Sequence, residues 1–101
     1  FDGDYYLGWG MCLDYTGKHA EAETIFLKAN ELDPNGYFVA AHIGRHYVET
    51  AEYAAARPWL ERSLRLSQTN AIATSLLQIA NERLLEAATN PSVRSLLDRA
   101  R

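Results

Sequence analysis

The strongest structural signal in the chain lies in residues 3–36, GDYYLGWGMCLDYTGKHAEAETIFLKANELDPNG, because residues 37–70, YFVAAHIGRHYVETAEYAAARPWLERSLRLSQTN, repeat their pattern 34 positions later. Such a period is typical of stacked helical repeats, in which each unit is one supersecondary element. Chance would give about two identities in this overlap at ordinary residue frequencies. The identical pairs are Gly10 and Gly44, Thr16 and Thr50, Ala20 and Ala54, Ala22 and Ala56, and Leu32 and Leu66.

Each unit is predicted to form two helices. Its first half carries apolar residues at the three- and four-residue spacing of one helical face, and a break follows at Gly17 or near Ala51. Its second half carries another such stripe, which in the first unit ends at residues 33–36, since Pro34 cannot continue a helix. No segment alternates with period two for long, so we expect an all-α chain. The apolar positions are Tyr6, Trp9, Leu13, Ala22, Ile25, Phe26, Ala29, Leu32, Ala40, Ile43, Tyr47, Tyr53, Ala56, Leu60 and Leu64.

Small residues recur where the two helices of a unit are expected to approach each other. Gly10 and Ala22 in the first unit correspond to Gly44 and Ala56 in the second. We expect large neighbours to fill these notches. Pro58 falls inside the predicted fourth helix, where it removes one backbone hydrogen bond, so we expect a kink there; a late helix start is the alternative.

Residues 71–101 follow the pattern less closely. Asn70 is a plausible N-cap for an apolar helix that continues to about Ala88. Asn90 and Pro91 then predict a short final helix. We interpret this segment as a degenerate third repeat or a capping pair that covers the last apolar face.

The order of residues in the first unit resembles the signature of the tetratricopeptide repeat (TPR). The second unit resembles it too, with Ala51 and Gln68 departing from the family's Gly and Pro. The resemblance implies a right-handed superhelical solenoid of antiparallel helix pairs, forming one domain over residues 1–101 with units 3–36, 37–70 and 71–101. The residues that carry it are Tyr6, Trp9, Gly10, Leu13, Gly17, Ala22, Phe26, Ala29 and Pro34, then Ile43, Gly44, Tyr47, Tyr53, Ala56, Leu60 and Ser63.

The resemblance also implies a function, because the concave face of such a solenoid is its usual binding surface. In the family this groove is lined mainly by the first helix of each repeat. The apolar members predict a strip for an apolar ligand, with arginines available for acidic or carbonyl groups; alternatively, some of them pack under missing neighbouring repeats. Carried over by position, the groove residues are Leu7, Met11, Asp14, Tyr15, Phe38, Ala41, His42, Arg45, Glu49, Ile72, Ser75, Leu76, Ile79 and Arg83.

One specialised function is excluded by these same positions. Repeats that grip chaperone C-termini hold the terminal carboxylate with Lys, Asn and Arg side chains. The matching residues here are Leu7, Met11, His42, Ile72 and Leu76, so the cationic clamp is missing.

Catalysis and cofactor binding are not expected. His42, His46 and Glu49 have metal-ligand spacing on one helix, but Ile43 stands where a zinc protease motif has its general base. Cys12 is the only cysteine, and we expect it to be a small packing residue. No glycine-rich phosphate loop or nucleophile elbow occurs. We therefore predict a non-enzymatic chain with no metal or other cofactor.

The net charge of −3 gives no electrostatic reason to bind nucleic acid, and no apolar run approaches the roughly 20 residues that span a bilayer. We therefore expect a protein or peptide partner. Phe1 is not an initiating methionine, which indicates a piece of a longer protein. We expect a cytoplasmic location, or a periplasmic one if that longer protein is a membrane protein. The main alternative function is a C-terminal appendage of a larger bacterial membrane enzyme, since residues 54–63, 70–73 and 83–86 faintly resemble the tails of O-antigen ligases or polymerases. Self-association through exposed end helices is a third possibility.

Overall fold

The computed structural model describes residues 2–89 and 98–99, and the first of these ranges forms five α-helices joined by short turns. The expectation of an all-α chain is confirmed for the described residues. The predicted short helix after Pro91 lies outside them, apart from residues 98 and 99. The helices are α1 (Asp2–Tyr15), α2 (His19–Leu32), α3 (Tyr37–Glu49), α4 (Tyr53–Leu66) and α5 (Ala71–Thr89).

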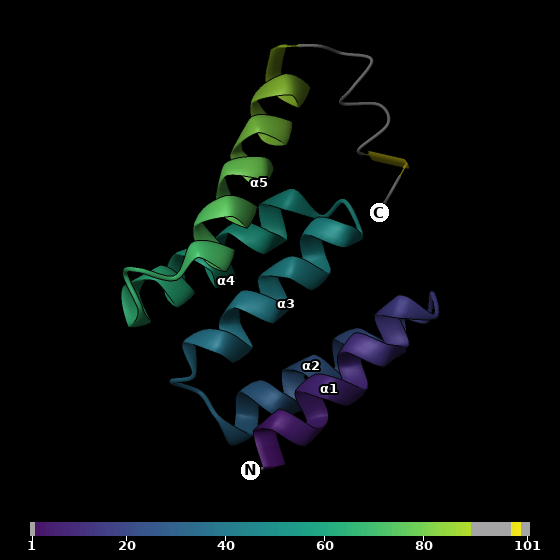
Figure 1. Cartoon of the computed structure of the whole chain (residues 1–101). Helices are drawn as coiled ribbons and strands as arrows, with labels where there is room; N and C mark the ends of the chain where they lie inside the picture. Colours follow the sequence, from purple (N-terminus) through teal and green to yellow (C-terminus); the bar gives the residue numbers. More distant parts are fainter. Residues whose placement is uncertain (1, 90–97, 100–101) are drawn as a thin grey trace.

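The helices pack in consecutive pairs. α1 packs against α2 and α3 against α4, and α5 then lies on both α4 and α3 (Figure 1). α1 also contacts α3, so the first helices of successive units adjoin one another on the nearer side of the view, with α2 and α4 behind them. The chain is thus a helical-repeat solenoid, as the 34-residue period predicts. None of the described helices is long and apolar enough to cross a membrane.

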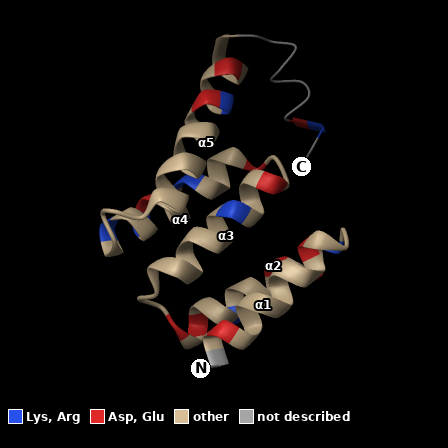
Figure 2. Cartoon of the chain, in the orientation of Figure 1, with Lys and Arg blue, Asp and Glu red and all other residues tan. Residues whose placement is uncertain are grey.

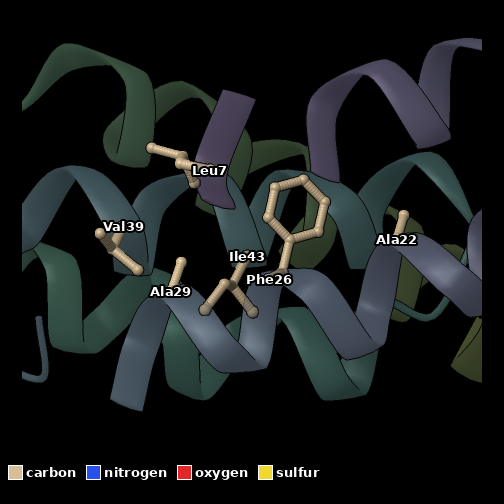
Figure 3. Packing of buried hydrophobic residues seen from close by; sticks show 6 residues of the cluster. All are labelled: Leu7, Ala22, Phe26, Ala29, Val39 and Ile43. Carbon is tan, nitrogen blue, oxygen red and sulfur yellow. The ribbon is translucent and has the colours of Figure 1, made fainter. Parts of the chain in front are cut away.

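The core runs without a break from one unit into the next. Its first cluster combines side chains of α1, α2 and α3: Leu7, Ala22, Phe26, Ala29, Val39 and Ile43 (Figure 3). The second cluster joins α3, α4 and α5 through Ala41, Ala56, Leu60 and Ala73. Because α3 contributes to both clusters, the two helix pairs cannot separate without exposing apolar surface from each.

The predicted glycine notches are present. A Cβ atom built on Gly10 would lie 2.9 Å from Phe26 of α2, and one built on Gly44 would lie 2.4 Å from Leu60 of α4. Both distances are below any ordinary carbon–carbon contact, so each glycine is needed for the close approach of its helix pair. Phe26 and Leu60 are themselves 34 positions apart, so the repeat preserves the large residue together with its notch.

The two turns inside the units share one hydrogen-bond pattern. After α1, the amides of Gly17 and Lys18 donate to the carbonyls of Asp14 and Leu13, at 3.0 and 2.8 Å. After α3, Ala51 and Glu52 repeat this pattern 34 positions later, at 3.1 and 2.7 Å. The pattern is the Schellman motif, which requires a left-handed residue after the helix.

Ala51, which stands where the repeat signature has Gly, occupies this left-handed position in the second unit. Gly17 has φ +83°, a conformation without steric cost for glycine. Ala51 has φ +61° at the equivalent position, where its Cβ is crowded by the backbone. The turn therefore forms in both units, but with strain in the second.

Two predictions at the ends of α4 and α5 have different outcomes. α4 begins at Tyr53 and contains Pro58, so the alternative of a late helix start is wrong. The first turn forms regardless, with the amide of Ala56 donating to the carbonyl of Glu52 at 3.0 Å. The N-cap at Asn70 is confirmed, because its Oδ1 accepts a hydrogen bond of 3.3 Å from the amide of Ala73.

Candidate binding site

A hollow of about 140 Å³ lies between the first helices of the two units, and it brings together six of the predicted groove residues. We call it the α1–α3 hollow. Its lining comes from three helices: Met11, Asp14 and Tyr15 from α1, Phe26 from α2, and His42, Arg45, His46 and Glu49 from α3. The core cluster of α1, α2 and α3 holds α1 beside α3, and so sets the width of the hollow.

The inner wall of the hollow holds a buried hydrogen-bond group. Nδ1 of His46 lies 2.9 and 2.7 Å from the two carboxylate oxygens of Asp14. His19 adds a contact from its own Nδ1 to Oδ1 of Asp14, at 2.9 Å. Since a carboxylate oxygen accepts, both imidazoles donate to it. Asp14 was predicted as a groove residue; it borders the hollow, but its carboxylate joins α1 to α2 and α3.

His42 forms another part of the wall and is nearly inaccessible to solvent, at 5% exposure. Its ring packs edge-on against Phe38, with 4.4 Å between the ring centroids. Burial lowers the pKa of His42, and the positive charge of Arg45 lowers it further, against a smaller opposing effect of Glu49. The imidazole is therefore neutral at pH 7.

The rim of the hollow is charged and aromatic. Nε of Arg45 lies 2.9 Å from Oε1 of Glu49, and both side chains are about half exposed. Tyr15 is the most exposed of the large apolar residues, at 93%, and Met11 is partly exposed. A guest can therefore meet an aromatic ring and an ion pair before reaching the buried wall. Acidic residues predominate on α1 and α2, whereas α3 to α5 carry both signs (Figure 2).

The other predicted groove residues lie elsewhere. Leu7 belongs to the core cluster of α1, α2 and α3 and presents no surface to a ligand. Phe38 is about half exposed next to His42 but does not line the hollow. The residues of α5 are also outside it: Ile72, Ser75, Ile79 and Arg83 are all exposed. Arg83 is engaged with Glu86, at 3.2 Å, and this hydrogen bond raises the pKa of the guanidinium.

The metal-ligand spacing on α3 and the predicted packing role of Cys12 have separate outcomes. His42, His46 and Glu49 do not form a shared ligand set, because His46 turns its Nδ1 to Asp14; among the described residues no three His, Cys, Asp or Glu side chains are placed to hold a metal ion. Cys12 is exposed, so its predicted packing role is wrong. The reason is its position on α1 midway between the buried residues Gly10 and Asp14, which turns it to the opposite side of the helix.

Phe26 and His46 line the hollow although neither was predicted to do so. Phe26 was assigned to the core, where it is also found. His46 was considered only as a metal ligand together with His42. No pattern in the sequence signals that its partner is Asp14, since the two residues are 32 positions apart and the repeat places Cys12 and Val48 at their equivalent positions.

Comparison with known proteins gives one match. Residues 3–35 fit the family model described as the tetratricopeptide repeat. These residues cover α1, α2 and the turn between them, and the same architecture recurs in α3 and α4. No curated protein matches the chain.

Proposed function

Because this chain is a tetratricopeptide-repeat protein, we propose that it is a non-catalytic interaction scaffold that holds a segment of another polypeptide in the α1–α3 hollow. Repeats of this family generally mediate protein–protein interaction. The observation that supports the site is the gathering of Met11, Tyr15, Phe26 and His42 around one hollow, with Arg45 and Glu49 at its rim.

The proposed mechanism is burial of one apolar side chain of the guest together with polar contacts at the rim. Met11 and Phe26 supply apolar surface, and removal of about 25 cal/mol per Å² of apolar area from water favours binding. Arg45 and Glu49 can exchange their mutual ion pair for contacts with the guest backbone, since an exposed pair of this kind contributes less than about 1 kcal/mol.

A peptide array probed with the purified chain tests the proposal. We expect Tyr15→Ala and Arg45→Glu each to weaken the binding of captured peptides about tenfold, since the first removes a large aromatic contact surface and the second reverses a charge at the rim. Matched controls are Tyr5→Ala, an exposed tyrosine of the same helix, and Arg57→Glu, an exposed arginine of α4; neither lines the hollow. If the controls weaken binding as much as the hollow variants, or no peptide binds at all, the proposal is wrong.

Self-association through α5 is a second candidate, favoured by one observation. Ile72 and Ile79, seven residues apart and so on one face of this helix, are exposed at 42 and 40%. A second copy that covers these side chains would remove apolar surface from water. Light scattering over a concentration series tests this, and a constant monomer mass with no change in Ile79→Lys would exclude it. The appendage of a membrane enzyme stays a prediction that the flanking gene sequence can test.

A further inference from the structure

The side of α1 opposite its buried residues is apolar and is left uncovered by the described part of the chain. Tyr5 and Trp9 are exposed at 70 and 45%, and Cys12 is exposed one turn further along. The ring centroid of Tyr6 lies 5.5 Å from that of Tyr5 and 6.0 Å from that of Trp9, so the three rings form one cluster. The amide of Thr16, also an exposed residue, donates to the carbonyl of Cys12 at 3.1 Å and extends the helical geometry. We call Tyr5, Trp9, Cys12 and Thr16 the outer face of α1.

The repeat shows how these positions are used where a helix pair precedes them. In α3 the positions of Tyr5, Trp9 and Cys12 are almost fully buried and are covered by the first unit; they are Val39, Ile43 and His46. In α5 the corresponding Ala73 and Ala80 are fully buried, since α5 packs on α3 and α4. These are therefore helix-packing positions. α1 stands at one end of the row α1, α3, α5 and is the described helix in which they have no neighbour (Figure 1).

The opposite end of the row offers no matching surface. Leu7 of α1 and Ala41 of α3 are buried where each of these helices meets the following unit. α5 carries Ser75 at the same position and Glu82 seven residues later, and both are exposed. A head-to-tail stack of copies would thus set aromatic rings against polar side chains, whose burial without partners is costly. An isologous contact, which uses the outer face of α1 in both copies, avoids this mismatch.

The outer face of α1 is complementary to itself in an antiparallel arrangement. A two-fold axis level with the middle of the face sets Tyr5 of one copy opposite Thr16 of the other. The same register sets Trp9 opposite Cys12. Each large ring thereby meets a small side chain, as the interdigitation of two helix surfaces requires. We propose that the outer face of α1 packs in this register against α1 of a second copy, so that the chain forms a two-fold symmetric dimer.

The charges beside the outer face agree with this register. Asp4 and Lys18 are both exposed, one near each end of α1. In the antiparallel dimer Asp4 of each copy comes next to Lys18 of the other, which places opposite charges together at two symmetric points. In a parallel pair of helices the two Asp4 side chains would meet instead, and like charges repel.

Light scattering of the chain over a concentration series, with a reductant present, tests the dimer. One helix from each copy gives a small interface, so we expect dissociation in the micromolar range. Trp9→Lys should weaken the association at least about tenfold, because each dimer loses two large aromatic contacts. Ile79→Lys, which changes an exposed apolar residue of α5, is the matched control and should leave the association unchanged. Circular dichroism verifies that each variant is folded, and Tyr5→Lys replaces Trp9→Lys if the latter is not.

Two results of this series would overturn the inference. One is a chain that stays monomeric up to about 1 mM, well above the dissociation constant of a specific small interface. The other is a dimer that Ile79→Lys dissociates and Trp9→Lys does not, since the contact would then lie on α5.

Cysteine cross-linking tests the register. In a Cys12→Ser background, Tyr5→Cys and Thr16→Cys in one chain give two thiols eleven residues apart, roughly 16 Å along the helix and too far for a disulfide within the chain. We expect oxidation to link the double variant into a covalent dimer, and to link a mixture of the two single variants. Neither single variant alone should be linked. A link in Tyr5→Cys alone, or none in the double variant, would show that the antiparallel register is wrong.

The dimer is separable from the proposed peptide binding, because neither Tyr5 nor Trp9 lines the α1–α3 hollow. Trp9→Lys should therefore bind a captured peptide in solution as tightly as the wild type does. Peptide binding by a strictly monomeric chain would keep the scaffold function and refute the dimer. A dimer that Trp9→Lys dissociates, in a chain that captures no peptide, would refute the scaffold function and keep the dimer.

Discussion

His46 in α3 and Asp14 in α1 form a buried hydrogen bond across 32 residues, with 2.7 Å between Nδ1 and Oδ2. Both side chains are almost fully shielded from water, at 2 and 6% exposure, so each needs the other as a partner. The bond is one of the few polar links between the first and second units, which otherwise meet through apolar side chains. It also fixes the rotation of α3 that brings His42 to the hollow, four residues earlier on the same helix.

The first prediction concerns this pair. His46→Ala should lower the free energy of unfolding by about 2–3 kcal/mol, because it deprives the buried carboxylate of Asp14 of its shortest hydrogen bond. The double variant Asp14→Ala/His46→Ala should lose less than the sum of the two single variants. Urea unfolding followed by circular dichroism measures these values.

His19→Ala is the control for this cycle. His19 contacts the same carboxylate, but its side chain is 46% exposed, so its removal should cost less than about 1 kcal/mol. Equal losses for His19→Ala and His46→Ala would contradict the assigned difference in burial.

The second prediction addresses the strained turn after α3. Ala51→Gly should raise the free energy of unfolding by about 1 kcal/mol, because glycine adopts the φ of +61° without the crowding of Cβ. The reciprocal change, Gly17→Ala, should lower it by a similar amount at the matching position of the first unit. Thermal unfolding of both variants checks the sign, and a destabilised Ala51→Gly would mean that the turn is not left-handed.

The third prediction tests the glycine notch of the second unit. Gly44→Ala should lower the free energy of unfolding by about 1–2 kcal/mol, since the new methyl group would meet Leu60 and force it to move. Gly8→Ala is the matched control on α1: a Cβ there meets no atom within 4 Å, so the change should instead stabilise the helix by about 0.5–1 kcal/mol. Chemical denaturation should therefore show changes of opposite sign in the free energy of unfolding for Gly44→Ala and Gly8→Ala. Changes of the same sign would argue against the notch.

The fourth prediction is the pH dependence that arises from His42. Its pKa is lowered from 6.5 in the folded chain, chiefly by burial and then by Arg45, so the unfolded chain binds more protons below that pH. The contribution of His42 to the free energy of unfolding is therefore constant above pH 6.5 and decreases as the pH falls below it. In His42→Leu the slope of stability against pH between 5 and 6.5 should be shallower than in the wild type. An identical slope in both proteins, measured by urea unfolding at each pH, would show that His42 is accessible to protons.

Most of the fold could be predicted because the residues that shape each helix pair occur at equivalent positions in both units. Gly10 with Phe26 and Gly44 with Leu60 occupy equivalent positions, and so do Gly17 and Ala51. A pattern of this kind reflects local backbone geometry and helix-to-helix spacing, which depend on residue size and conformational freedom. The N-cap at Asn70 could be predicted as well, because N-capping is an interaction between residues close together in the sequence.

The assignment of groove residues from α1 was only partly correct in position, and the reason is geometric. The buried residues of α1 are Gly3, Leu7, Gly10 and Asp14, which form one stripe at helical spacing. Leu7 and Asp14 were predicted to face the groove, but they belong to this stripe. Met11 follows Gly10 of this stripe by one residue, and Tyr15 follows Asp14 by one, which places both about 100° further round the helix, at the edge of the hollow.

α3 presents a different difficulty, since it has neighbours on both sides. Residues 39–44 and His46 are all buried, so no single face of this helix can be distinguished from its pattern of apolar residues. The hydrogen bond of His46 with Asp14, and the lack of one at Nε2 of His42, depend on how two units meet. Neither can be derived from the properties of either helix alone.

Because α1 lies beside α3 and α3 beside α5, the helix spacing determines which side chains of an extended guest can contact successive helices. Packed helix axes are about 8–10 Å apart, and an extended polypeptide advances about 3.3 Å per residue. A strand-like guest that crosses these helices at right angles would therefore present about every third side chain to a new helix. Contact positions along the guest would therefore recur about every three residues, and each further helix pair in the solenoid would add one such position.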